Sequence, residues 1–245
     1  MHPPVKYVWL LLLQLFLFIT SCSNSAQSMA SQTLAPGRFF QQRYQPLGRA
    51  ILDEDLRAIE ANAYGLDLNQ VHAENMTLLF YASWHRKKDA FRRLLELGAD
   101  PNLMIAGQGT MVNFAAKDPD PEYMQILLEH GGDPNAKMQS GDPVAIYALM
   151  HGPFQTVRNL VWAGADVNGR DKDGDTILMT AVAVFKFAEA RELLDMGADP
   201  KLKNNMGANV KTYLEGRNPE VGSDAYRQKE TLVAKLQAMG VWNKL

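Results

Sequence analysis

The sequence LLELGADPN at residues 94–102 decides the fold, because close copies of it return at a fixed interval. The copies are LLEHGGDPN (127–135), LVWAGADVN (160–168) and LLDMGADPK (193–201). Their glycines are spaced 33 residues apart, and one further step back reaches another glycine, which gives the series Gly65, Gly98, Gly131, Gly164 and Gly197. A period of this size indicates a stack of similar units rather than one globular core.

Each unit contains signals for two helices. A residue suited to a helix start lies 21 residues before each glycine: Thr77, Thr110, Pro143 and Thr176. Threonine can cap free backbone N–H groups, and proline is tolerated in a first turn. The second helix carries an apolar stripe, as in Phe91, Leu94 and Leu95, and the glycine after it is a common helix terminator. We therefore expect helix pairs that bury their stripes only by stacking on neighbours.

These motifs resemble those of ankyrin repeats. GDTILMTA at 174–181 is similar to the family's G-x-T-P-L-H-x-A, although Ile177 replaces the proline and Met179 the histidine, which we expect to loosen local hydrogen bonding. The resemblance implies an all-α ankyrin-repeat solenoid of helix-turn-helix units with short hairpin turns, over residues 44–217. The clear copies are 72–104, 105–137, 138–170 and 171–203, and the degenerate end copies are 44–71 and 204–217.

The C-terminal segment 218–245 is expected to hold a capping helix. Within it, residues 223–240 are amphipathic, with Leu232, Leu236 and Met239 on one face and Gly240 at the end. Such a helix would shield the last repeat from solvent.

The N-terminus indicates an export signal. Residues 7–19 form an apolar run, too short to span a bilayer but suited to the core of a signal peptide. The ITSC sequence that ends at Cys22 resembles a bacterial lipobox. That resemblance implies that residues 1–21 are a lipoprotein signal peptide and that a lipid is attached to Cys22. The alternative is an ordinary secretory signal cut nearby. Ser23, rather than aspartate, favours the outer membrane.

Residues 22–43 are expected to be a flexible tether and N-terminal lead-in. The stretch 23–37 is small, polar and uncharged. GRFFQQRY at 37–44 is basic and aromatic, which could indicate membrane or nucleic-acid contact, but we favour packing of Phe39, Phe40 or Tyr44 onto the first repeat. The net charge of −2 gives no indication of nucleic-acid binding.

No motif favours catalysis. DKDGDT at 171–176 resembles the start of a calcium loop, but Val182 stands where an EF-hand requires glutamate, so an ordinary repeat turn is favoured. His85 and His151 lie two repeats apart, too far to share a metal. The sequence has no G-x-S-x-G elbow, no second cysteine and no Gly-rich phosphate loop. We expect a protein without a cofactor, not an enzyme.

A solenoid of this kind presents a concave face formed by the repeat turns and the ends of the first helices. For Trp84 and Met150, the alternative to partner contact is packing between helices. The predicted partner-binding residues are Glu74, Met76, Trp84, His85, Met104, Lys117, Asp118, Gln139, Asp142, Met150, His151, Arg170, Lys172, Asp173 and Asp175.

Together these features predict a monomeric, membrane-anchored, periplasm-facing protein that binds another protein. Tethered proteins of this build resemble immunity proteins that neutralise phospholipase effectors of the type VI secretion system, which implies a lipase toxin as the partner. The alternative is a scaffold or assisting factor for a resident enzyme or assembly of the cell envelope.

Overall fold

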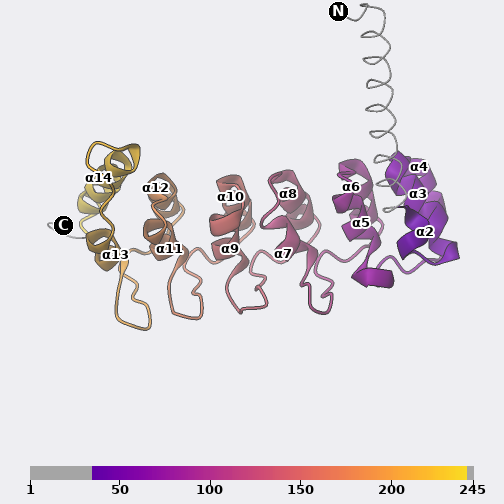
Figure 1. Ribbon diagram of the computed structural model, residues 1–245, viewed down its shortest axis with the longest axis horizontal. Coiled ribbons are helices and arrows are strands. Elements are labelled where there is room, and N and C mark those ends of the chain that lie inside the picture. The colour runs from indigo at the N-terminus through magenta and orange to yellow at the C-terminus, as the bar shows by residue number, and fades with distance from the viewer. Residues whose placement is uncertain (1–34, 242–245) are drawn as a thin grey trace, which may run out of the picture.

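The computed structural model describes residues 35–241, which form a row of stacked helix pairs (Figure 1). All thirteen α-helices of this part are short, and β structure within it is limited to three isolated bridges. In chain order the helices are α2 (Pro36–Phe39), α3 (Gln45–Asp53), α4 (Leu56–Ala63), α5 (Leu78–Trp84), α6 (Lys88–Glu96), α7 (Met111–Ala115), α8 (Glu122–Glu129), α9 (Val144–His151), α10 (Phe154–Trp162), α11 (Ile177–Ala183), α12 (Phe187–Asp195), α13 (Val210–Gly216) and α14 (Asp224–Ala238).

The helix pairs share one arrangement. The first helices α5, α7, α9, α11 and α13 lie side by side, and the second helices α6, α8, α10, α12 and α14 form a parallel row beside them. Loops that project from the row, here called fingers, connect each pair to the next and span residues 97–110, 130–143, 163–176 and 196–209 (Figure 1). The three isolated bridges pair residues of these fingers: Ile105 with Gly109, Lys137 with Pro143 and Arg170 with Thr176.

Local chemistry sets the helix boundaries as expected. The hydroxyl of each predicted threonine accepts a hydrogen bond from the backbone N–H three residues later, at Thr77, Thr110 and Thr176. Pro143 occupies the same capping position of α9 but has no side chain that can accept such a bond. At the other end, Gly98 and Gly164 adopt φ of 100° and 101°, which a residue with a Cβ rarely tolerates.

The core is continuous along the stack. The apolar stripes of the second helices face the first helices, and Phe91, Leu94, Met124, Leu127 and Leu160 are fully buried. Leu128 and Val161, the equivalents of Leu95 in the next two repeats, are only partly buried. Burial of this kind on both sides of each helix pair is the main source of stability in a stack.

Asparagines in the fingers connect successive repeats. Asn102 Oδ1 accepts a hydrogen bond from the Asp133 backbone N–H at 2.8 Å, and its Nδ2 donates to the Gly131 carbonyl at 2.8 Å. Asn135 repeats both bonds with Asp166 and Gly164. This ladder explains why the Asp-x-Asn sequence recurs, beyond the turn that we expected of it.

Both ends of the stack are closed by atypical elements. Phe39, Phe40 and Tyr44 are buried, and Phe40 packs edge-on against Tyr81 with ring centroids 5.0 Å apart. The favoured interpretation of GRFFQQRY as a packing segment is therefore confirmed. Helix α2 already begins at Pro36, inside the stretch expected to be flexible.

At the other end, α14 begins after the N-cap Ser223 and packs against α12, so α13 and α14 form the last helix pair. Leu232 and Leu236 are buried as expected. The prediction for Met239 was wrong: this residue is 48% exposed, because the helix has already ended at Ala238.

Several predictions on the N-terminus lie outside the described residues. These are the signal peptide at 1–21, the lipid on Cys22 and most of the tether at 22–43. Among the helices of residues 35–241, none is long and apolar enough to cross a bilayer.

Candidate partner-binding groove

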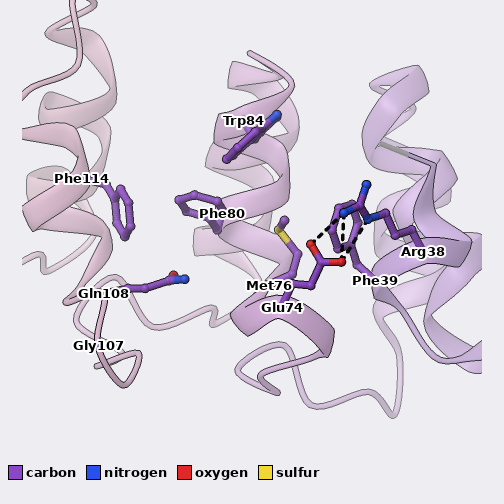
Figure 2. A pocket seen from close by; sticks show the side chains of 9 residues that line it. All are labelled: Arg38, Phe39, Glu74, Met76, Phe80, Trp84, Gly107, Gln108 and Phe114. Atoms are coloured by element: carbon purple, nitrogen blue, oxygen red, sulfur yellow. Dashed lines mark hydrogen bonds and ion pairs between the residues drawn. The ribbon is translucent and has the colours of Figure 1, made fainter. Parts of the chain in front are cut away.

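A groove opens on the finger side of the stack, between α2, α5 and α7 (Figure 2). It encloses about 650 Å³, a volume typical of ligand sites. We call it the aromatic groove, and its lining residues are Arg38, Phe39, Glu74, Met76, Phe80, Trp84, Gly107, Gln108 and Phe114.

The aromatic groove owes its character to three rings from neighbouring first helices. Phe80 and Phe114 meet edge to face with centroids 4.7 Å apart, and Phe80 and Trp84 lie 5.6 Å apart. Trp84 is one helical turn after Phe80, so both rings project from the same side of α5. Trp84 remains 56% exposed, which excludes the alternative of packing between helices. A large aromatic side chain held open to solvent beside a groove is a frequent interface anchor.

An ion pair forms one wall of the aromatic groove. Arg38 on α2 donates two hydrogen bonds of 3.1 Å to the Glu74 carboxylate (Figure 2). Glu74 and Asn75 both adopt left-handed backbone conformations, with φ of 57° and 58°. One period later, Gly107 takes the equivalent position of Glu74 with φ of 73°. The chain therefore keeps glutamate where glycine would carry less strain, and it uses that glutamate to hold the N-terminal helix against the groove.

Gln108 supplies an unsatisfied polar group. Its side chain extends from the first finger across the groove toward Phe80 (Figure 2). Its Oε1 is buried and has no hydrogen-bond partner among the described residues. A buried acceptor without a partner costs free energy, which a small rotation of the amide toward a bound N–H would recover.

A second hollow of about 410 Å³ continues from the groove and shares Phe80, Trp84 and Phe114 with it. Arg86 and Asp118 form an ion pair in its wall, with Nη1 and Oδ2 2.6 Å apart. This hydrogen bond raises the pKa of Arg86 further above its usual value.

Lys117 lies at the edge of the second hollow, with its Nζ 5.7 Å from the centre of the Phe114 ring. It is exposed, and it forms no ion pair with any residue in the described part of the chain. This lysine therefore presents an uncompensated positive charge in the same hollow as the exposed Trp84 and the half-buried Phe80 and Phe114.

Some predicted partner-binding residues meet at these two hollows. Glu74 and Trp84 line the aromatic groove, and Lys117 and Asp118 line the second hollow. Met76, predicted as a turn residue of the binding face, also lines the aromatic groove but contributes little exposed surface. It is 6% exposed because it lies at the bottom of the groove between α2 and α5.

The other predicted residues lie elsewhere. His85 is half-buried with its ring edge-on to Tyr81, and the exposed His151 packs on Tyr147, in both cases with centroids 4.5 Å apart. Met150 is exposed beside His151. The remaining members are on the fingers: Met104, Gln139, Asp142, Arg170, Lys172, Asp173 and Asp175.

Asp175 has a structural role within the stack. It is half-buried, accepts hydrogen bonds from the Tyr213 hydroxyl at 2.6 Å and from Asn204 Nδ2 at 2.7 Å, and so ties the third finger to the last finger and to α13. Burial and this hydrogen bond raise the pKa of Tyr213 to about 12. Nearby, the Asp171 carboxylate accepts backbone N–H groups of Asp173 and Asp175, which confirms an ordinary repeat turn for DKDGDT.

Sequence reasoning missed six lining residues of the aromatic groove: Arg38, Phe39, Phe80, Gly107, Gln108 and Phe114. Phe80 occupies the position of the motif histidine, and this departure, together with Trp84 four residues later, was a signal that could have located the groove. In the next repeat Asn113 occupies that position. It caps α7 and donates a hydrogen bond to the Lys137 carbonyl, so the expected loss of hydrogen bonding does not occur there.

Comparisons with known proteins agree with this architecture. A family model of ankyrin repeats in three copies matches residues 112–204. A solved structure of EF0377, an ankyrin repeat protein, is similar with a TM-score of 0.64 and 20% identity, covering 80% of this chain and 99% of that one.

An ankyrin repeat domain from Acinetobacter baumannii AYE, ABAYE2397, is similar with a TM-score of 0.63 and 27% identity, covering 80% of this chain and 98% of that one. A search of curated proteins found no match. The family model, these two structures and the stacked helix pairs lead to one conclusion: residues 112–204 match ankyrin repeats, and residues 35–241 have the fold of an ankyrin-repeat solenoid.

Proposed function

We propose that this chain is a non-catalytic module that binds a protein partner through the aromatic groove. Ankyrin repeats generally serve as protein-interaction scaffolds. The observation that carries the proposal is the exposed Trp84, held beside Phe80 and Phe114 at the edge of a groove of about 650 Å³. Tryptophan that becomes buried in an interface contributes strongly to affinity.

Site-specific crosslinking in cells tests this proposal. A photoreactive phenylalanine analogue replaces Trp84 in one variant and Trp162 in a matched control. Trp162 is 72% exposed but lies at the end of α10, away from the groove. We expect a discrete crosslinked protein only from position 84. Equal crosslinking at both positions, or none at 84, would contradict a binding role for the groove.

The second part of the proposal concerns the location of the protein in the cell. The lipobox-like ITSC sequence supports a lipid on Cys22, which would tether the solenoid to a membrane so that it faces the periplasm. Ser23 favours the outer membrane as that membrane. The Cys22→Ser variant is expected to leave the membrane fraction and to lose incorporation of labelled palmitate. A variant that remains in the membrane fraction would exclude the lipid anchor.

The proposed partner is a phospholipase toxin delivered by a type VI secretion system, with this chain as the immunity protein. Support comes from the combination of an export signal and a binding solenoid, because an inhibitor tethered in the periplasm would meet such a toxin at its site of action. Deletion of the gene should sensitise cells to a toxin encoded beside it. Unchanged survival, together with a resident envelope enzyme crosslinked at position 84, would favour the scaffold role instead.

A further inference from the structure

The chemistry of the aromatic groove indicates what kind of segment it binds. We infer that the groove takes an extended peptide segment that inserts one large apolar side chain and places an acidic side chain beside Lys117. This inference rests on the proposed protein-binding function and adds the conformation, anchor and charge of the bound segment.

The apolar anchor follows from the lining of the groove. Phe39 and Met76 are buried in its walls, while Phe80, Trp84 and Phe114 present their rings to the opening. An aromatic or long aliphatic side chain would cover these rings and remove the exposed face of Trp84 from water. A polar side chain would lose its water there without gaining partners.

The extended conformation follows from Gln108. Its side-chain amide carries both a donor and an acceptor, and the acceptor is buried without a partner. A peptide unit in an extended segment offers a free N–H and a free C=O, which match that amide. In a helix these groups are already used in internal hydrogen bonds, apart from those at the ends. Gln108 therefore favours a segment whose backbone is not helical.

The acidic side chain follows from the charges around the groove. Arg38 is paired with Glu74, and Arg86 with Asp118. Lys117 is the cation at these two hollows that has no carboxylate partner among residues 35–241. A carboxylate from the bound segment would compensate it, whereas a basic side chain would be repelled.

The test uses random nine-residue peptides displayed on phage and selected on the full chain. We expect the enriched peptides to share a large apolar residue with Asp or Glu to one side of it. A Trp84→Ala variant should weaken binding of the selected peptides by roughly tenfold or more. A Gln108→Leu variant, which removes the amide but keeps the bulk, should weaken them by roughly fivefold.

A charge swap isolates the acidic side chain. In the Lys117→Glu variant the preference for a glutamate-containing peptide over its lysine counterpart should fall by roughly fivefold or more. The peptide glutamate loses its cationic partner, and the peptide lysine gains an anionic one. Lys201→Glu is the matched control, since Lys201 is an exposed lysine on the last finger, far along the stack. Thermal melts of all variants establish that they are folded.

The outcomes separate the two proposals. Enrichment of peptides without acidic residues, or an equal effect of Lys117→Glu and Lys201→Glu, would overturn the inferred charge. Failure to enrich any peptide that depends on Trp84 would overturn the extended-peptide inference, while a crosslink at position 84 would still support protein binding. If the full chain instead self-associates through Trp84 in light scattering, the occupant is a second copy, and the inference is wrong.

Discussion

At the scale of single residues, the fingers show how a short repeated phrase stabilises a stack. The aspartate of each Asp-x-Asn turn accepts a backbone N–H within its own repeat, as Asp100 does from Asn102 at 2.8 Å. The asparagine then bonds to the following repeat through both ends of its amide. The aspartate is therefore required by a hydrogen bond within its own turn, and the asparagine by hydrogen bonds to the next repeat. The last copy has Lys201 at the asparagine position, where the ladder ends.

Replacing one asparagine of the ladder should weaken the contact between two repeats. Asn102→Ala removes both bonds to the next finger, and we expect the free energy of unfolding to fall by about 1–2 kcal/mol. Urea titration followed by far-UV circular dichroism measures the change. Lys201→Ala is the matched control at the same position of the last turn and should change stability by less than about 0.5 kcal/mol. Equal effects of both substitutions would show that the ladder contributes nothing.

At the scale of helices, the repeats begin their first helices with different residues at the same N-cap position. Thr77, Thr110 and Thr176 cap their helices with a hydroxyl, whereas Pro143 provides only a suitable backbone conformation, with φ −56° and ψ 136°. The three threonines have similar extended backbone angles. A threonine at position 143 would therefore fit without strain.

Pro143→Thr is expected to stabilise the protein. The new hydroxyl would cap α9 and would contribute about 1 kcal/mol, part of which is offset by the greater freedom of the unfolded chain without proline. We expect the free energy of unfolding to rise by about 0.5 kcal/mol in Pro143→Thr. Thr176→Ala, which removes a capping hydroxyl, should lower it by about 1 kcal/mol. Thermal denaturation of both variants checks the pair. A lower melting temperature for Pro143→Thr would contradict the equivalence of the four positions.

The N-terminal elements carry a pH-sensitive contact. The His72 ring lies edge-on against Phe40 and Tyr44, with centroids 4.9 and 4.5 Å away, and neither ring nitrogen has a hydrogen-bond partner among residues 35–241. Burial lowers the pKa of His72 below its usual 6.5, and the negative charge of Asp67 opposes this shift only in part. The folded protein therefore favours the neutral ring.

Stability at this end should fall as the medium becomes acidic. Because the unfolded chain binds a proton near pH 6.5 and the folded chain only at lower pH, the contribution of the neutral ring is complete above 6.5 and is lost as the pH falls through the lowered pKa. His72→Phe keeps the aromatic packing and breaks no side-chain hydrogen bond. We expect it to match the natural protein at pH 7.5 and to be more stable at pH 5. Melting temperatures across this range provide the measurement, and parallel profiles would exclude His72 as the cause.

The sequence predicts the elements of this fold better than its site. The threonine caps and the glycine stops are local signals that can be read from a few neighbouring residues, and the 33-residue period shows that the same signals recur along the chain. The aromatic groove depends on three segments that are separated along the chain: α2, residues 74–84 with α5, and residues 107–114 with α7. Met76 is buried where α2 packs near it, and no local pattern specifies where a short helix packs.

At the scale of the whole molecule, the solenoid behaves as a chain of contacts between neighbours. The second helices are joined by ion pairs between adjacent repeats, such as Arg92 with Glu129 and Arg158 with Glu192. Between α8 and α10 the described residues show no such pair, and Asn159 instead donates a hydrogen bond to the Pro121 carbonyl. These exposed pairs add little individually, so the buried stripes hold the repeats together.

A cavity should therefore act differently at the end of the stack and in its middle. Leu236 on α14 and Leu127 on α8 are both fully buried leucines, so Leu236→Ala and Leu127→Ala remove the same atoms and each costs about 2–5 kcal/mol. In a one-dimensional stack, the terminal cavity should increase hydrogen exchange in α13 and α14 and leave α5 to α8 protected. The central cavity has neighbours on both sides and should increase exchange in α7 to α10, with cooperative loss of the whole stack at lower urea. Mass-spectrometric hydrogen exchange on both variants resolves these patterns helix by helix. Uniform loss of protection in the Leu236→Ala variant would mean that the repeats unfold as a single cooperative core, and the partner groove near α5 would then depend on contacts at the opposite end of the chain.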